Sequence, residues 1–248
     1  MVVIKSNTEI EKMRKAGEIT AGALKAAEEA IRVGMTTHEL DTIIRKYITS
    51  HGAKPSFLGY GGFPASACIS INDEVIHGIP GPRKIEDGDI VSVDVGAYIN
   101  GYHGDSAKTF AVGNVSEEAL KLMKSTEESL YIAIEMAKPG VRLGDIGAAI
   151  AKHNMDNGFS VVREFVGHGV GKDLHEEPEV PNFGTEGRGL RLQAGMVIAV
   201  EPMINLGTAK IKIMPDRWTV KTCDGKVSAH FEHTIAITQN GAVILTRI

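Results

Sequence analysis

Residues 88–94 read GDIVSVD and residues 195–201 read GMVIAVE, and these two stretches decide the fold. Each stretch starts at a glycine, continues through apolar and β-branched residues and ends at a carboxylate, which is the pattern of a buried strand. Equivalent positions in the two stretches lie 107 residues apart. The chain therefore carries the same strand twice, with an acidic residue at the same point each time.

A pair of helices is predicted before each of these strands. Apolar residues at spacings of three and four predict the helices, and Ser6 and Thr36 each stand three residues before a glutamate, the capping-box signature of a helix start. The predicted ranges are 6–34, 36–52, 116–140 and 143–158. Because equivalent landmarks recur at offsets of 106 or 107 residues, we predict an internal duplication, roughly residues 6–111 and 116–237. Since no Pro- or Ser-rich linker separates the halves, we predict one domain that covers residues 1–248.

An Asn-Gly pair at residues 100–101 lies in the middle of a strand-like run that extends over residues 90–111. It predicts a hairpin, because both central residues of a type I′ turn need positive φ. In that register Asp94 faces Ala107, and Asp105 is its diagonal neighbour, about 7–8 Å away at the backbone. Two such carboxylates either share a cation or are solvated acids on an exposed face.

Further acids and histidines favour a shared cation. Glu201 ends the second apolar strand, where a partly buried carboxylate needs a positive partner. Glu232 lies in a strand predicted at 229–237, which leads into a second Asn-Gly turn at 240–241. The histidines that accompany glycine-containing segments are His77, His168 and His175.

The composition is that of an ordinary globular protein, with 43% hydrophobic and 23% charged residues in a chain of 248. The net charge of −4 argues against a strong nucleic-acid binder, which would carry a basic excess. No apolar run approaches the ~20 residues that span a bilayer, and the N-terminus has no signal-peptide pattern. Because the two cysteines, Cys68 and Cys223, cannot form a disulfide framework, the cytoplasm is the expected location.

Taken together, these residues resemble the type I methionine aminopeptidases, bacterial short form, of the pita-bread metallopeptidase family. The resemblance extends from Ile4 to Thr246. The segments that carry it are 68–80, 88–94, 104–105, 167–171, 175–178, 201–203 and 232–234. It implies an α+β fold in which two pseudo-symmetric helix–helix–strand halves surround a central antiparallel sheet.

The resemblance also implies a site for two divalent metal ions with five ligands. Asp105 and Glu232 match the bridging ligands, Asp94 would hold one ion, and His168 and Glu201 would hold the other. Four carboxylates could neutralise two divalent cations. Such an oxygen-rich set favours manganese, iron or cobalt over closed tetrahedral zinc.

The resemblance also implies which residues contact the substrate. His175 would stabilise the developing oxyanion, His77 would contact the amide nitrogen beyond the cleaved bond, and Glu201 would be the general base. The residues that match the wall of a methionine pocket are Tyr60, Phe63, Cys68, Leu174 and Trp218, with Phe57 nearby. Ordinary core packing is the alternative interpretation of these apolar residues.

The implied activity is hydrolytic removal of the N-terminal (initiator) methionine from nascent proteins and peptides with a small second residue. One alternative is another pita-bread hydrolase, a Xaa-Pro aminopeptidase or prolidase relative, which usually carries an added N-terminal domain. The helices here begin by residue 10. Another alternative is a non-catalytic binding protein on the same fold, which we expect to have lost ligands.

The resemblance also bears on partners and on a second ion. Nascent polypeptide N-termini are the expected substrate, with transient ribosome contact, a monomeric state, and neither membrane nor nucleic-acid binding. Asn72 and Ser228 match a peripheral site for a monovalent cation. We interpret His230 as a surface or structural residue.

Overall fold

Four helices are present in the computed structural model, which describes residues 1–247, and each begins at its predicted start. They are α1 (Asn7–Ala30), α2 (Thr37–Ser50), α3 (Glu117–Met136) and α4 (Leu143–Asp156). Glu9 N donates to the Ser6 hydroxyl and Ser6 N donates to the Glu9 carboxylate, which completes the predicted capping box. None of these four helices within residues 1–247 has both the length and the apolar character needed to cross a bilayer.

The first helix ends earlier than predicted. Ile31 adopts extended backbone, with φ −61° and ψ 130°, so α1 stops at Ala30 and does not continue to Gly34. Gly34 instead lies in the following turn, with φ +85°, and its N–H donates to Ile85 O. The exit from α1 is therefore set by pairing with a distant segment, which the local pattern does not reveal.

The strands are short except for β4 and β5, and every pairing among the described strands is antiparallel. They are β1 (Lys54–Pro55), β2 (Ala67–Ile71), β3 (Glu74–Ile76), β4 (Ile90–Ile99), β5 (Tyr102–Ala111), β6 (Ser160–Val161), β7 (Gly167–Gly169), β8 (Glu176–Val180), β9 (Val197–Val200), β10 (Met203–Asn205), β11 (Ile211–Ile213), β12 (Val220–Thr222), β13 (Ser228–His230), β14 (His233–Thr238) and β15 (Gly241–Ile244). A 3₁₀ turn, η1 (Tyr60–Gly62), follows β1. Among the described residues the pairings form four sheets, with the orders β1-β4-β2 (β5 on β4), β13-β10-β6, β11-β12-β3 and β15-β14-β9-β7-β8.

The predicted hairpin of β4 and β5 is confirmed. Asn100 and Gly101 both have positive φ, +56° and +84°, as a type I′ turn requires. Asp94 pairs with Ala107, so Asp105 is the diagonal neighbour of Asp94, as predicted. One short motif therefore positions two of the proposed ligands.

The single strand predicted at 229–237 is wrong, because the chain changes sheets within it. β13 pairs with β10, whereas β14 pairs with β9, and Phe231 and Glu232 lie between them. Glu232 N donates to Ala107 O at 2.9 Å, so this residue bonds to β5 and not to β10 or β9. The following turn is also displaced by one residue, since Thr238 pairs with Gly241.

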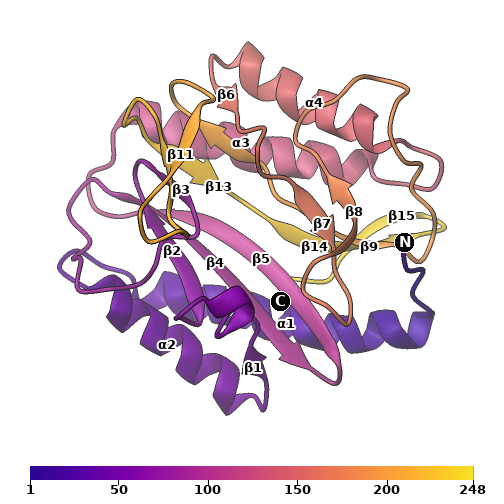
Figure 1. Ribbon diagram of the computed structural model, residues 1–248, viewed down its shortest axis with the longest axis horizontal. Helices are drawn as coiled ribbons and strands as arrows, with labels where there is room; N and C mark the ends of the chain where they lie inside the picture. Colours follow the sequence, from indigo (N-terminus) through magenta and orange to yellow (C-terminus); the bar gives the residue numbers. More distant parts are fainter. Residues whose placement is uncertain (248) are drawn as a thin grey trace.

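Figure 1 shows the α1–α2 pair along the lower edge and the α3–α4 pair along the upper edge, with strands between them. Each pair packs on an apolar cluster of its own, the first including Ile44 and Val93, the second including Ile146 and Ile198. A third cluster around Leu245 contains residues of α1 and β9 and connects the two halves. The halves thus have similar layouts, and their origin by duplication stays a prediction.

Candidate metal centre

Residues from both halves of the chain meet at a cavity of about 340 Å³. Its lining includes every residue that the sequence predicted for the metal site and the methionine pocket: Phe57, Tyr60, Phe63, Cys68, His77, Asp94, Asp105, His168, Leu174, His175, Glu201, Trp218 and Glu232. Four further lining residues were not predicted: Ile76, Glu164, Phe165 and Val166.

Asp105 and Glu232 come together across the junction between β5 and β14. Asp105 N donates to Thr234 Oγ1 at 3.0 Å, and the Thr234 hydroxyl donates to Asp105 O at 2.7 Å. The hydrogen bond from Glu232 N to Ala107 O continues this junction. Asp94 reaches the same place from β4, through the hairpin register. Hydrogen bonds to the backbone therefore hold the three acidic residues near one another and leave their carboxylate oxygens free of these bonds.

His168 lies on β7, and the backbone fixes its tautomer. Nδ1 lies 2.9 Å from the carbonyl oxygen of Gly169, which can only accept, so Nδ1 carries the proton. Nε2 then presents a lone pair, 3.7 Å from Asp105 Oδ2 and 3.6 Å from Glu201 Oε1. Burial lowers the pKa of His168 to about 3, so the ring is neutral near pH 7. A neutral imidazole oriented in this way is a suitable metal ligand.

Glu201 directly follows β9, and its side chain is only 13% exposed. Burial raises the pKa of Glu201 to about 8. The Asn182 side chain donates to the backbone oxygen of Glu201 at 2.9 Å, and Glu201 Oε2 lies 3.4 Å from His230 Nε2. His230 is therefore buried beside the site, which excludes a surface position and leaves the structural interpretation. The Thr109 hydroxyl, which donates to His230 O and accepts from His230 N, keeps it there.

The carboxyl groups of the cavity lack a source of positive charge. Burial raises the pKa of Asp94, Asp105 and Glu232 well above the usual range, and neighbouring carboxylates raise it further. Within residues 1–247, one buried oxygen of each has no hydrogen-bond donor. Asp105, His168 and Glu232 also each place one ligand atom within 4.8 Å of the others. The donor set therefore fits a divalent cation, which would satisfy these oxygens.

Comparison with known proteins agrees with this chemistry. Residues 11–239 match the family described as metallopeptidase family M24. The chain belongs to this family. It is 56% identical to the methionine aminopeptidase of Clostridium perfringens over 248 residues, 100% of both chains, and 52% identical to methionine aminopeptidase 1 of Bacillus subtilis over the same share.

Solved M24 structures share the fold. The methionine aminopeptidase of Thermotoga maritima superposes with a TM-score of 0.98 and 46% identity over 100% of both chains. The prolidase of Pyrococcus furiosus superposes with a TM-score of 0.80 and 29% identity, and this chain covers 66% of it. The resemblance seen in the sequence is confirmed, and so is the α+β pita-bread fold that it implied.

Two histidines lie beside the proposed ligands of this M24 site. The Tyr60 hydroxyl lies 2.8 Å from His175 Nδ1, at the open side of the cavity. His77 has φ +58°, and its ring meets Phe165 and Trp218 edge-on, at centroid distances of 5.7 and 6.3 Å. Burial lowers the pKa of both histidines, that of His77 to about 4. Both rings are therefore neutral hydrogen-bonding groups near pH 7.

The apolar wall of the cavity is a small cluster separate from the main cores. Its buried members are Phe57, Phe63, Ala65, Cys68 and Leu174, with Ile79 and Trp218 packed against them. Phe63 and Trp218 meet edge-on at 5.1 Å between ring centroids. Because five of these seven side chains line the cavity, the arrangement argues against ordinary core packing for those five. Phe165 was missed since its signal is weak, an isolated aromatic two residues before the Gly-His-Gly segment.

Asn72 and Ser228 adjoin each other, as a shared ion site would require. Ser228 N donates to Asn72 O at 2.8 Å. The Asn72 side chain is already engaged, because it donates to Asp89 and accepts from Ile90 N. The monovalent-cation site stays a prediction.

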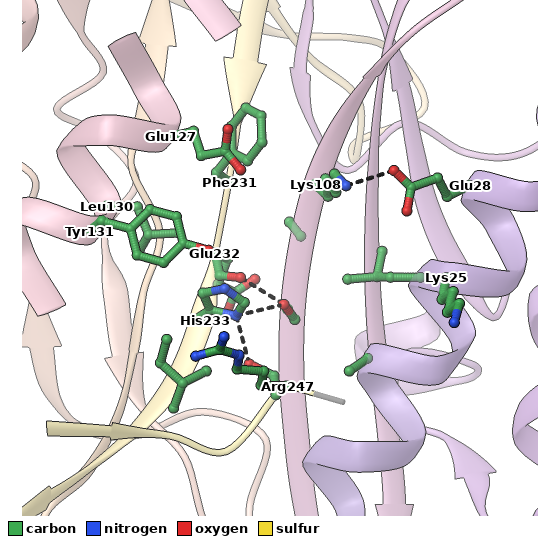
Figure 2. A pocket seen from close by; sticks show the side chains of 16 residues that line it. Lys25, Glu28, Lys108, Glu127, Leu130, Tyr131, Phe231, Glu232, His233 and Arg247 are labelled. Carbon is green, nitrogen blue, oxygen red and sulfur yellow. Dashed lines mark hydrogen bonds and ion pairs between the residues drawn. The ribbon is translucent and has the colours of Figure 1, made fainter. Parts of the chain in front are cut away.

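A second cavity, of about 500 Å³, lies between α1 and α3 (Figure 2). Glu232 borders both cavities. The Ser106 hydroxyl donates to Glu232 O at 2.6 Å, and Lys108 pairs with Glu28 at 2.7 Å on the α1 side. In this cavity the Ser106 hydroxyl of β5 therefore supports the backbone of Glu232.

The metal-free protein should lose stability as the pH rises from 7 to 8. Burial raises the pKa of Glu201 to about 8, so the folded state keeps a proton near pH 7 that the unfolded chain has released. Such a proton lowers the free energy of unfolding by about 1.4 kcal/mol per pH unit. The buried histidines, whose pKa is lowered, make the free energy of unfolding rise with pH, but this effect is confined to pH values below about 6.5. Thermal melting in a chelator would measure the decline.

A divalent cation should remove this dependence, because it replaces the proton as the source of positive charge. The Glu201→Gln variant, which lacks this titrating group, should show a shallower decline than the unmodified protein. A metal-free melting temperature that stays constant between pH 7 and 8 would contradict the raised pKa of Glu201 in the protein without a cation.

Proposed function

We propose that this protein is a metal-dependent aminopeptidase that removes the N-terminal methionine from nascent proteins and peptides. The observation that carries the proposal is one cavity in which the four proposed carboxylate ligands and an imidazole adjoin an apolar cluster and two further histidines. A polar centre beside an apolar pocket suits a scissile amide next to an unbranched thioether side chain. Full-length similarity to methionine aminopeptidases supports the same activity.

The proposed ligands are those expected from the sequence: Asp94, Asp105, His168, Glu201 and Glu232. Asp105 and Glu232 would bridge two ions, since their ligand atoms lie near each other and near His168. When bound, divalent cations would supply Lewis acidity, which polarises the scissile carbonyl and lowers the pKa of a water molecule. The oxygen-rich donor set favours manganese, iron or cobalt.

The chain's own residues would move protons and orient the peptide. Glu201 is the proposed general base, because its carboxylate lines the cavity beside the other proposed ligands, with Oε1 3.6 Å from His168 Nε2. His175, held near the Tyr60 hydroxyl, would donate a hydrogen bond to the developing oxyanion. His77 would contact the amide nitrogen beyond the cleaved bond.

We propose that the protein acts as a cytoplasmic monomer on nascent chains, with transient ribosome contact and a monovalent cation near Asn72 and Ser228. The acidic net charge of −4 and the two cysteines support the exclusion of nucleic-acid binding and the choice of compartment.

Peptides that begin with Met-Ala or Met-Gly should be cleaved, whereas those that begin with Met-Leu or Met-Lys should not. The ring of His77, the proposed neighbour of the second residue, meets Phe165 and Trp218 edge-on, and we expect these rings to limit the room for a longer side chain. We expect a difference of about 100-fold in kcat/KM. Release of free methionine from matched tetrapeptides, followed by mass spectrometry, would measure it.

The same assay separates the alternatives. Equal turnover of Met-Ala and Met-Lys peptides would overturn the proposed specificity. Preferential cleavage of Xaa-Pro peptides would favour a prolidase-like enzyme, and binding without release of methionine would favour a non-catalytic protein.

A further inference from the structure

Lys5 is a buried lysine that lies before the first helix, remote in sequence from the metal centre. Its side chain is 2% exposed, and its Nζ lies 2.7 Å from Glu176 Oε2. Lysine is almost never buried unless it is paired. Glu176 directly follows His175, so this ion pair joins the N-terminal segment to the loop that carries a proposed catalytic side chain.

The loop between β7 and β8 is built around the Glu176 carboxylate. Asp173 N donates to Glu176 Oε1 at 3.3 Å. A Cβ at Gly171 would collide with the same carboxylate, so the loop backbone lies directly against it. Gly171 O also accepts from His103 N at 2.9 Å. The position of the Glu176 carboxylate therefore sets the path of the chain that leads to His175.

Lys5 is itself held by a rigid element. The backbone N–H of Lys5 donates to Gly195 O at 2.7 Å, and a Cβ at Gly195 would collide with Ile4. The N-terminal segment and the chain at Gly195 are therefore in close contact. Gly195 starts the segment that continues through β9 to Glu201. The backbone of Lys5 is therefore anchored to the segment that leads to the proposed general base, and its ammonium group to the loop.

We propose that Lys5 is a positioning residue for His175, acting through Glu176. Without the ammonium group, the Glu176 carboxylate would be left half-buried without a counter-ion and would turn toward solvent. The loop would then relax, and His175 would move away from the Tyr60 hydroxyl and from the substrate carbonyl. This inference rests on the role proposed above for His175.

A double-mutant cycle between Lys5 and His175 tests the proposal. Lys5→Met keeps the length and apolar character of the side chain but removes the charge. We expect it to lower kcat for a Met-Ala peptide by about 10-fold to 100-fold, because small displacements of a catalytic group have effects of this size. KM and metal content should stay unchanged. In the His175→Ala background, Lys5→Met should lower kcat no further.

Matched variants complete the design. Lys15→Met removes a lysine from an exposed ion pair with Glu18, whose side chains are 55% and 46% exposed, and should leave kcat unchanged. If Lys5→Met does not fold, Glu176→Gln provides the same cycle, since it keeps the shape of the side chain and removes its charge. It should lower kcat in the otherwise unmodified enzyme and not in the His175→Ala enzyme.

Two outcomes would overturn the positioning role: an unchanged kcat in Lys5→Met, or the same fold-loss in both backgrounds. Full activity of the His175→Ala enzyme would instead contradict the role proposed for His175. The failure of this inference and the failure of the proposed function are therefore distinguishable.

Discussion

Replacement of Asp105 by alanine should abolish peptidase activity while the protein stays folded. The carboxylate is proposed to bridge both cations, so the substitution removes a ligand from each. The fold should survive because Thr234 binds the backbone of Asp105 and not its side chain. Burial raises the pKa of this carboxyl, so its loss also removes an unfavourably buried group. Peptidase rate, melting temperature and bound metal would be measured on one preparation.

Two controls accompany this experiment. A chelator should abolish the activity of the unmodified enzyme, and a divalent cation should restore it. Asp156→Ala removes an exposed aspartate that pairs with Lys152 on α4, and it should leave activity unchanged because surface ion pairs contribute at most about 1 kcal/mol. Full activity of the Asp105→Ala enzyme would contradict the two-metal assignment.

The parts of the fold that the sequence predicted correctly depend on short-range physics. The Ser6 capping box needs residues three positions apart, and the turn at residues 100–101 needs two neighbours that tolerate positive φ. The hairpin register follows from that turn, and it places Asp94 and Asp105 on adjacent strands without any knowledge of the rest of the chain.

The parts that were missed depend on contacts between distant segments. The chain leaves one sheet for another around Glu232, whose N–H bonds to β5, and nothing in the local alternation indicates this change. The sequence left open whether His230 is a surface or a structural residue for the same reason, since its neighbour Glu201 is 29 positions away in the chain. Lys5 looks like an ordinary polar residue before a helix until its partner, Glu176, is known.

The site was predicted from residue chemistry and from the family resemblance. Residue chemistry alone indicated a cluster of acids that needs a cation, and it left exposed acids as an open alternative. The structure argues against that alternative, because Asp105 is 3% exposed and Oδ1 of Asp94 is buried. The division of roles among the histidines came from the family resemblance, and their contacts now give it a physical basis that can be tested.

His168 and His175 should respond differently to replacement by alanine, although only seven positions separate them. His168 presents the Nε2 lone pair near Asp105 and Glu201, so His168→Ala should weaken metal binding and activity together. His175 lies at the open side of the cavity beside the Tyr60 hydroxyl, so His175→Ala should keep its metal and lose mainly kcat. Removal of one oxyanion donor typically costs about 10²–10³-fold in rate, or roughly 3–4 kcal/mol.

Calorimetric titration of metal into each variant, combined with kcat for a Met-Ala peptide, would separate the two roles. Tyr60→Phe is the matched variant on the substrate side, because it removes the hydroxyl next to His175 and leaves every proposed ligand in place. It should lower kcat less than His175→Ala does and should not change the metal affinity. If His175→Ala lost a metal ion and His168→Ala did not, the two assignments would have to be exchanged.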